Sequence, residues 1–216
     1  MKIHKQALYV AAFSSRFERV RDWGAGFHEM LHILKFSAKT GKLLWHYKSK
    51  GDFALGRLQF GHGLLTYRGR TYKALSLATG KTQWEYPLAG GFGGWLFDEK
   101  PLAPQLAVDG GFVVSVLGRW LLKVDPKGKK VWSRRMPSTI YSLAKKGARL
   151  YVVNDNDMMH VLQVDRGKML WKKRLPGGVG RYHRQWEIGY SSRYQYRSTP
   201  VIWGTHLLFW GEDGYL

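Results

Sequence analysis

His28 and His32 have the spacing in this sequence that is closest to a known catalytic motif. With Glu29 they match H-E-x-x-H, which on a helix places two imidazoles on one face to bind zinc and supplies a glutamate as general base. The neighbouring residues instead predict a strand from Leu31 to Phe36, and a strand turns Glu29 away from both histidines. We therefore interpret the motif as a loop running into a strand and predict no zinc there.

Two further segments have the composition of ligand-binding loops. Residues 154–157 read Asn-Asp-Asn-Asp, like the start of a calcium loop, but the glycine and distal glutamate of an EF-hand are missing. We predict a hairpin turn without calcium. Residues 90–96 are glycine-rich, yet no strand-to-helix transition follows that could cradle a phosphate. They are predicted to form a connecting loop, with Phe92, Trp95 and Phe97 as alternative anchors for a partner.

The composition excludes several classes of function. None of the 216 residues is cysteine, which excludes a disulfide scaffold, a thiol nucleophile and a cysteine-ligated zinc site. The 15 Asp and Glu residues form no convincing acid and base pair. No apolar run reaches the roughly 18 residues of a membrane-spanning helix. We therefore predict a globular chain that is not an enzyme and has no catalytic, metal or cofactor-binding residue.

Positive charge is the strongest signal for a partner. Lys and Arg number 35 against 15 Asp and Glu, a formal charge of +20. Cations interleaved with aromatic residues attract nucleic acids or anionic membrane surfaces, although turn lysines and solvated loops would give a similar count. The candidate residues for an anionic partner are Lys172, Lys173, Arg174, Arg181, Arg184, Trp186, Arg193 and Arg197.

The elements that must position these residues follow from an internal repeat. Four segments carry a glycine followed four residues later by tryptophan, and successive tryptophans are 39, 48 and 39 residues apart. A hairpin turn explains the glycine, because its positive φ is unfavourable for a residue with a Cβ. We predict that all four tryptophans are structural and buried against the next repeat. The repeat residues are Gly41, Trp45, Gly80, Trp84, Gly128, Trp132, Gly167 and Trp171.

Each repeat is predicted to form a four-stranded antiparallel sheet. One such sheet cannot bury both faces alone, so the repeats should stack as the blades of an all-β propeller. About four to five blades are expected within a single domain, and the first lacks an obvious first strand. Whether the ring is incomplete or closes with five blades is left open. The expected blades are 1–51, 52–90, 102–138, 139–177 and a partial 198–216, with insertion loops at 90–101 and 177–197.

The repeat resembles that of the PQQ-like, quinoprotein-type β-propellers. The best match is Ala38-Lys39-Thr40-Gly41-Lys42-Leu43-Leu44-Trp45, in the pattern A-x-T-G-K-x-x-W. Propellers of this type typically close with seven or eight blades, so the chain resembles part of a ring. A WD40 propeller is disfavoured because no Trp-Asp closes any repeat. The calcium ligands and catalytic aspartate of PQQ-dependent alcohol oxidation find no match here.

The resemblance implies a non-catalytic scaffold that binds other proteins, like the lipoprotein of the outer-membrane barrel-assembly machinery. It also favours a bacterial periplasm or envelope, although no clear signal peptide is present and the lipoprotein cysteine is missing. Two alternatives remain open at this point. One is a basic module that binds nucleic acid or another anionic surface, and the other is a PQQ-dependent dehydrogenase-like fragment.

Overall fold

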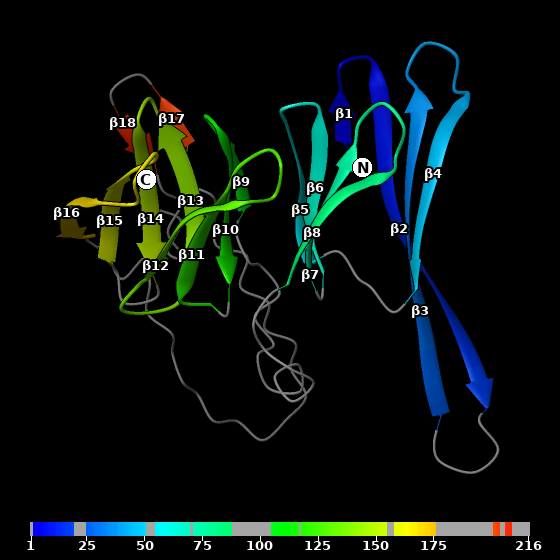
Figure 1. The fold of residues 1–216 in the computed structure, drawn as a ribbon, viewed down its shortest axis with the longest axis horizontal. Helices are drawn as coiled ribbons and strands as arrows, with labels where there is room; N and C mark the ends of the chain where they lie inside the picture. The colour runs from blue at the N-terminus through cyan, green and yellow to red at the C-terminus, as the bar shows by residue number, and fades with distance from the viewer. Residues whose placement is uncertain are drawn as a thin grey trace. The chain divides into compact units, whose positions relative to one another are not determined.

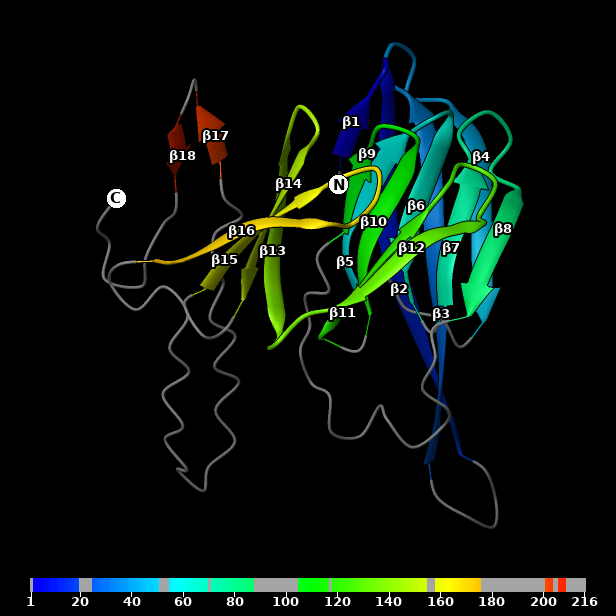
Figure 2. The ribbon, with the colours of Figure 1, turned by 60° about the vertical axis from the view of Figure 1, so that its left-hand side comes forward.

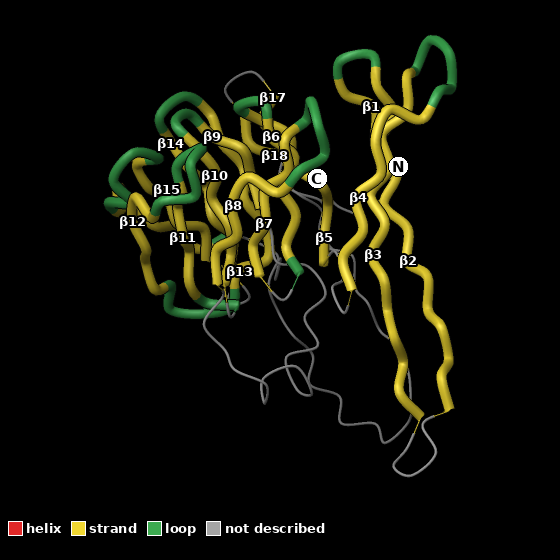
Figure 3. Tube along the Cα trace, turned by 45° about the vertical axis from the view of Figure 1, so that its right-hand side comes forward, coloured by secondary structure: helices red, strands yellow, loops and turns green. Residues whose placement is uncertain are grey.

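A computed structural model describes residues 2–19, 25–50, 55–69, 71–87, 105–116, 118–154, 158–175, 201–203 and 206–208. In these residues strands are joined by turns and loops (Figure 3). The chain divides into two compact units, residues 1–90 with 126–128 and residues 91–125 with 129–216. No helix in the described ranges is long and apolar enough to cross a membrane.

The first sheet has the order β1-β2-β3-β4. Its strands are β1 (Lys2–His4), β2 (Ala7–Arg19), β3 (Ala25–Ser37) and β4 (Leu43–Lys50). The short β1 supplies the first strand that the sequence did not make obvious. β2 and β3 pair along their whole length, whereas β4 pairs with β3 only from Met30 onward. The two long strands therefore continue past β1 and β4 as a ribbon (Figure 1).

The second sheet completes the core of the first unit. Its strands, in order, are β5 (Leu55–Gly61), β6 (Leu64–Arg68), β7 (Thr71–Ser76) and β8 (Thr82–Pro87). One face of the first sheet packs on the second through alternating side chains, because successive residues of a strand point to opposite faces. The buried residues of this layer are Ala7, Tyr9, Leu31, Ile33, Trp45, Leu58, Leu65, Tyr67 and Leu75.

The second unit repeats this arrangement. Its first sheet contains β9 (Gln105–Val108), β10 (Gly111–Val116), β11 (Trp120–Val124) and β12 (Lys130–Arg135). Its second contains β13 (Ile140–Lys146), β14 (Arg149–Asn154), β15 (Met158–Gln163) and β16 (Met169–Arg174) (Figure 2). A hairpin of β17 (Val201–Trp203) and β18 (His206–Leu208) follows, and β17 lies beside β13.

The same turn joins the third and fourth strands of all four sheets. The turn glycine has a φ of 68° at Gly41, 72° at Gly80, 84° at Gly128 and 64° at Gly167. A one-residue register shift next to each turn recurs in the pairing of the same two strands. The prediction of four-stranded antiparallel blades of the propeller type is thus confirmed in both units.

Candidate functional site

The repeat tryptophans and glycines form a docking contact. In the first unit the indole Nε1 of Trp45 donates a hydrogen bond to the carbonyl oxygen of Leu77 at 3.2 Å. The ring also lies against Gly80, where an added Cβ would come within 2.7 Å of the indole. Only glycine therefore permits this approach. The turn between β7 and β8 thus packs against the tryptophan of the preceding sheet and accepts its hydrogen bond.

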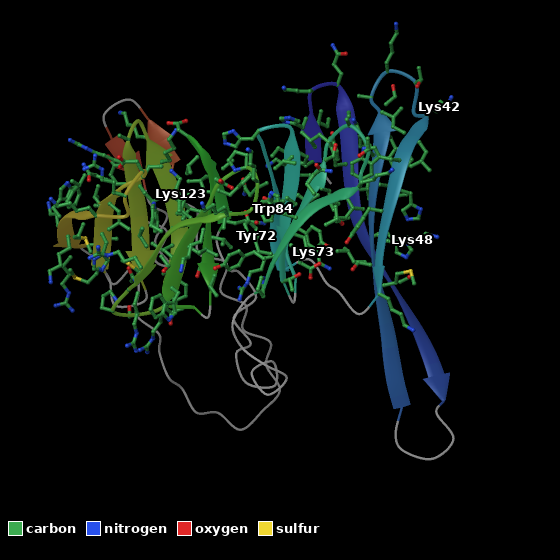
Figure 4. The ribbon with its side chains drawn as sticks, in the orientation of Figure 1. Lys42, Lys48, Tyr72, Lys73, Trp84 and Lys123 are labelled. Atoms are coloured by element: carbon green, nitrogen blue, oxygen red, sulfur yellow. The ribbon has the colours of Figure 1, made fainter. Side chains whose placement is uncertain are left out.

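The contact recurs with nearly the same geometry. Trp132 donates from Nε1 to Val164 O at 2.9 Å, and a Cβ at Gly167 would lie 2.7 Å from its ring. Trp84 donates to Pro126 O at 2.9 Å, and a Cβ at Gly128 would meet its ring at 2.6 Å. Tyr72 stacks edge-on against the same Trp84 ring at 5.5 Å (Figure 4).

The two ends of this series lack the contact. A Cβ at Gly41 would meet no atom within 4 Å, and the Trp171 side chain is 39% exposed, against 9% for Trp45 and Trp132. The expectation that all four tryptophans are buried therefore holds for Trp45 and Trp132, whereas Trp84 is half-buried and Trp171 is exposed. Within the described ranges, no turn glycine of a following repeat covers its ring.

Part of the predicted basic cluster lies on β16. Lys172, Lys173 and Arg174 occupy the end of this outermost strand and are all exposed. None of the three forms an ion pair with a described acidic residue. The remaining candidates lie outside the described residues; they are Arg181, Arg184, Trp186, Arg193 and Arg197.

Cations also line the neighbouring outer strand of the second unit. On β12, Lys130 and Arg135 are exposed, while the half-buried Arg134 donates from Nη1 to Gly167 O at 3.0 Å. This bond links β12 to the turn that leads into β16. Arg134 of β12 therefore lies beside the turn that precedes β16.

His160, which the sequence did not single out, lies on β15 directly across from Lys172 of β16. Its side chain is 2% exposed, and neither ring nitrogen has a hydrogen-bond partner. Burial lowers its pKa below 6.5, and the charges of Lys172 and Arg134 lower it further. Burial and the nearby positive charges thus both disfavour the protonated form of this imidazole. Its position in an apolar strand gave no signal in the sequence.

Lys123 is a second buried titratable group that sequence reasoning missed. Its side chain is 4% exposed on β11 (Figure 4), and burial lowers its pKa while Asp165 and Asp109 raise it. Asp109 itself forms an ion pair with Lys145, in which Oδ2 and Nζ are 2.7 Å apart. Asp109 and Asp165 are both exposed, so their charges act on the buried Lys123 from the surface of the unit, and we assign Lys123 a structural role.

The H-E-x-x-H segment lies wholly on the strand β3 and not on a helix; the expected loop before Leu31 is wrong, because β3 already begins at Ala25. His32 accepts or donates a 2.8 Å bond to Ser14 through Nε2, and its Nδ1 lies 2.9 Å from His46 Nε2. No sequence pattern connects these three residues, because only the pairing of β2, β3 and β4 brings them together. No group of three or more His, Cys, Asp or Glu suited to a metal occurs among the described residues.

Comparisons with known proteins agree with this architecture. A family model described as "Outer membrane protein assembly factor BamB" matches residues 118–182. A search of curated protein sequences found no match. The crystal structure of BamB from Moraxella catarrhalis is 17% identical with a TM-score of 0.52, and the match covers 78% of this chain and 51% of that one.

A computationally designed protein, Ika8, is similar over 93% of this chain and 55% of its own, at 12% identity and a TM-score of 0.59. The chain therefore spans about half the length of both structures. At these identities the likeness establishes the fold. The family match over residues 118–182 and the four-stranded sheets together show a β-propeller architecture with a PQQ-like repeat.

Proposed function

We propose that this chain is a non-catalytic scaffold that binds other proteins. The observation that carries the proposal is the repeated docking of a tryptophan on the next turn glycine, found at Trp45, Trp84 and Trp132. At Trp45 and Trp132 the contact joins two sheets of one unit, so these repeat residues contribute to packing. The outer strands and turns are left exposed as surfaces for partners.

The comparisons support the same role. The matching family model is described as an outer membrane protein assembly factor, and an assembly factor acts on other proteins. Hydrophobic side chains exposed on outer strands are candidate contacts for such partners, because the centre of a protein interface is richer in apolar residues than its rim. These side chains are Leu43, Leu44, Val131, Leu170 and Trp171.

Site-specific photo-cross-linking in the producing cell tests the scaffold. A photoreactive amino acid at Leu44 or Val131 should give a discrete adduct, and the cross-linked protein should bind the purified chain in defined stoichiometry. The same amino acid at the buried Val114 should give none. If neither exposed site yields a partner that binds in purified form, the scaffold proposal fails.

The non-catalytic part of the proposal has its own test. The purified chain is mixed with PQQ and calcium, and oxidation of alcohols and sugars is followed with an artificial electron acceptor. We expect no turnover above the protein-free control. Turnover that scales with protein concentration would favour the dehydrogenase-like alternative.

A further inference from the structure

The strand β16 differs from the other outer strands in one respect. Trp45 on β4 and Trp132 on β12 are buried by the turn of the next sheet, whereas Trp171 on β16 is 39% exposed. Every residue of β16 after Met169 is exposed. β16 thus presents its side chains and one backbone edge to solvent.

The free backbone edge is the first half of a binding site. β16 is the last strand in the order β13-β14-β15-β16, and no described strand pairs with its outer edge. An edge strand offers a row of N–H and C=O groups that can pair with an extended chain. Such pairing would place the added strand about 4.8 Å from β16.

The side chains of β16 determine which charge favours binding of an added strand. Lys172 and Arg174 point to one face of the strand, and Trp171 and Lys173 point to the other, because side chains alternate. Cations on an edge strand repel another copy of this +20 chain. An acidic strand would instead be attracted, since opposite charges directly across a strand pair stabilise it.

The electrostatics of the buried interior are consistent with an uncompensated positive surface. Lys172 and Arg134 both act on His160 and lower its pKa after the larger effect of burial. Lys172, Lys173 and Arg174 have no acidic partner among the described residues that would cancel this field.

We propose that the outer edge of β16 binds an extended acidic segment of a partner protein, which adds to the sheet as a further strand. Acidic side chains at alternate positions would face Lys172 and Arg174, and the intervening apolar side chains would contact Trp171. This inference rests on the scaffold function and names its partner class. The cross-linking test at Leu44 and Val131 does not involve β16, so the two can fail separately.

The probe is a fluorescein-labelled peptide of alternating glutamate and valine, and its binding is followed by fluorescence anisotropy at low and physiological salt. We expect the double variant Lys172→Glu/Arg174→Glu to bind at least about tenfold more weakly than the parent. A peptide of alternating lysine and valine should not bind the parent.

The matched control is Lys48→Glu/Lys50→Glu on β4. These lysines are also exposed on an outer strand and two residues apart (Lys48 is labelled in Figure 4), and the change in net charge is the same. We expect at most about a threefold loss for this control. Equal losses in both double variants would show that net charge governs binding and would overturn the proposal. Circular dichroism confirms that both variants are folded.

Two other results would also overturn it. A peptide with N-methyl groups on one edge cannot pair along that edge, so we expect one of the two alternately methylated peptides to lose binding. If both bind as well as the parent peptide, no strand is added. If a single-stranded oligothymidylate binds more tightly and shows the same dependence on Lys172 and Arg174, the partner is a nucleic acid.

Discussion

Trp45 and Trp171 occupy the same position in two copies of the same repeat, yet their environments differ. Both stand four residues after a turn glycine and near the start of an outer strand. The Trp45 side chain is 9% exposed and bonded to Leu77 O, while Trp171 is 39% exposed. The difference shows that the repeat motif supplies the tryptophan, whereas burial depends on the glycine turn of the next repeat.

The largest effect should come from deleting a docked indole. Trp45→Ala removes a buried ring and its hydrogen bond, so we expect a loss of about 3–5 kcal/mol in the free energy of unfolding. Trp171→Ala removes a ring that is more than one-third exposed, and the loss should stay below about 1 kcal/mol. Urea denaturation of both variants measures the difference. Similar losses for the two would mean that docking does not stabilise the sheets.

The turn glycines give a second comparison, of intermediate size. An alanine at Gly80 must adopt an unfavourable φ of +72°, and its Cβ would also overlap the Trp45 ring. An alanine at Gly41 must adopt a φ of +68°, but its Cβ would contact no other atom. We expect a loss of about 2–4 kcal/mol for Gly80→Ala and about 1 kcal/mol for Gly41→Ala.

Gly63 provides the control for backbone strain. It has a φ of +73° with no atom within 4 Å of an added Cβ, and it lies outside the docking series. Gly63→Ala should therefore match Gly41→Ala in thermal denaturation. A loss at Gly41 as large as that at Gly80 would contradict the idea that the Gly41 turn is undocked.

The pH dependence of stability should distinguish the buried His160 from the exposed His46. Burial lowers the pKa of His160 below 6.5, so the unfolded chain binds a proton before the folded chain does. This group therefore leaves the free energy of unfolding unchanged above about pH 6.5. As the pH falls below that value, the free energy of unfolding decreases by at most about 1.4 kcal/mol per pH unit.

His160→Phe should therefore flatten the fall in unfolding free energy on the acidic side, because neither ring nitrogen is hydrogen-bonded in the folded state. The pKa of His46 is also lowered, first by burial and then by the charges of Lys48 and His32. Its side chain is nevertheless exposed. His46→Phe should change the slope less. Parallel slopes for His160→Phe and the parent would count against a neutral buried imidazole.

The smallest effect on stability is expected for the charges of the outer strands. Lys172→Glu/Arg174→Glu and Lys48→Glu/Lys50→Glu alter exposed side chains without ion pairs among the described residues. Each should change the free energy of unfolding by less than about 0.5 kcal/mol per site. A cooperative loss in the β16 variant alone would show that these cations stabilise the sheet, and peptide binding would then need milder Lys172→Gln/Arg174→Gln changes.

Much of the fold could be predicted from local pattern. The spacing of Gly41 and Trp45, repeated three times, located the turn and the outer strand of every sheet. The long pairing of β2 with β3 was not predicted, because a regular strand register over 13 residues leaves no short-range signature. The H-E-x-x-H segment was expected as a loop running into a strand at Leu31, and only the end of that segment was placed correctly. The contact of His32 with Ser14 and His46 could not be foreseen, because it depends on the pairing of three strands.

The sequence by itself determined the turns, the strands and the side chain offered by each repeat, since positive φ at glycine and alternation along a strand are local properties. Tertiary structure decided which of those side chains became buried. Trp132 is enclosed because Gly167 leaves room for its ring, and the pKa of His160 is lowered because packing removed it from water. Both outcomes depend on a neighbouring sheet far along the chain, whose approach no local pattern encodes.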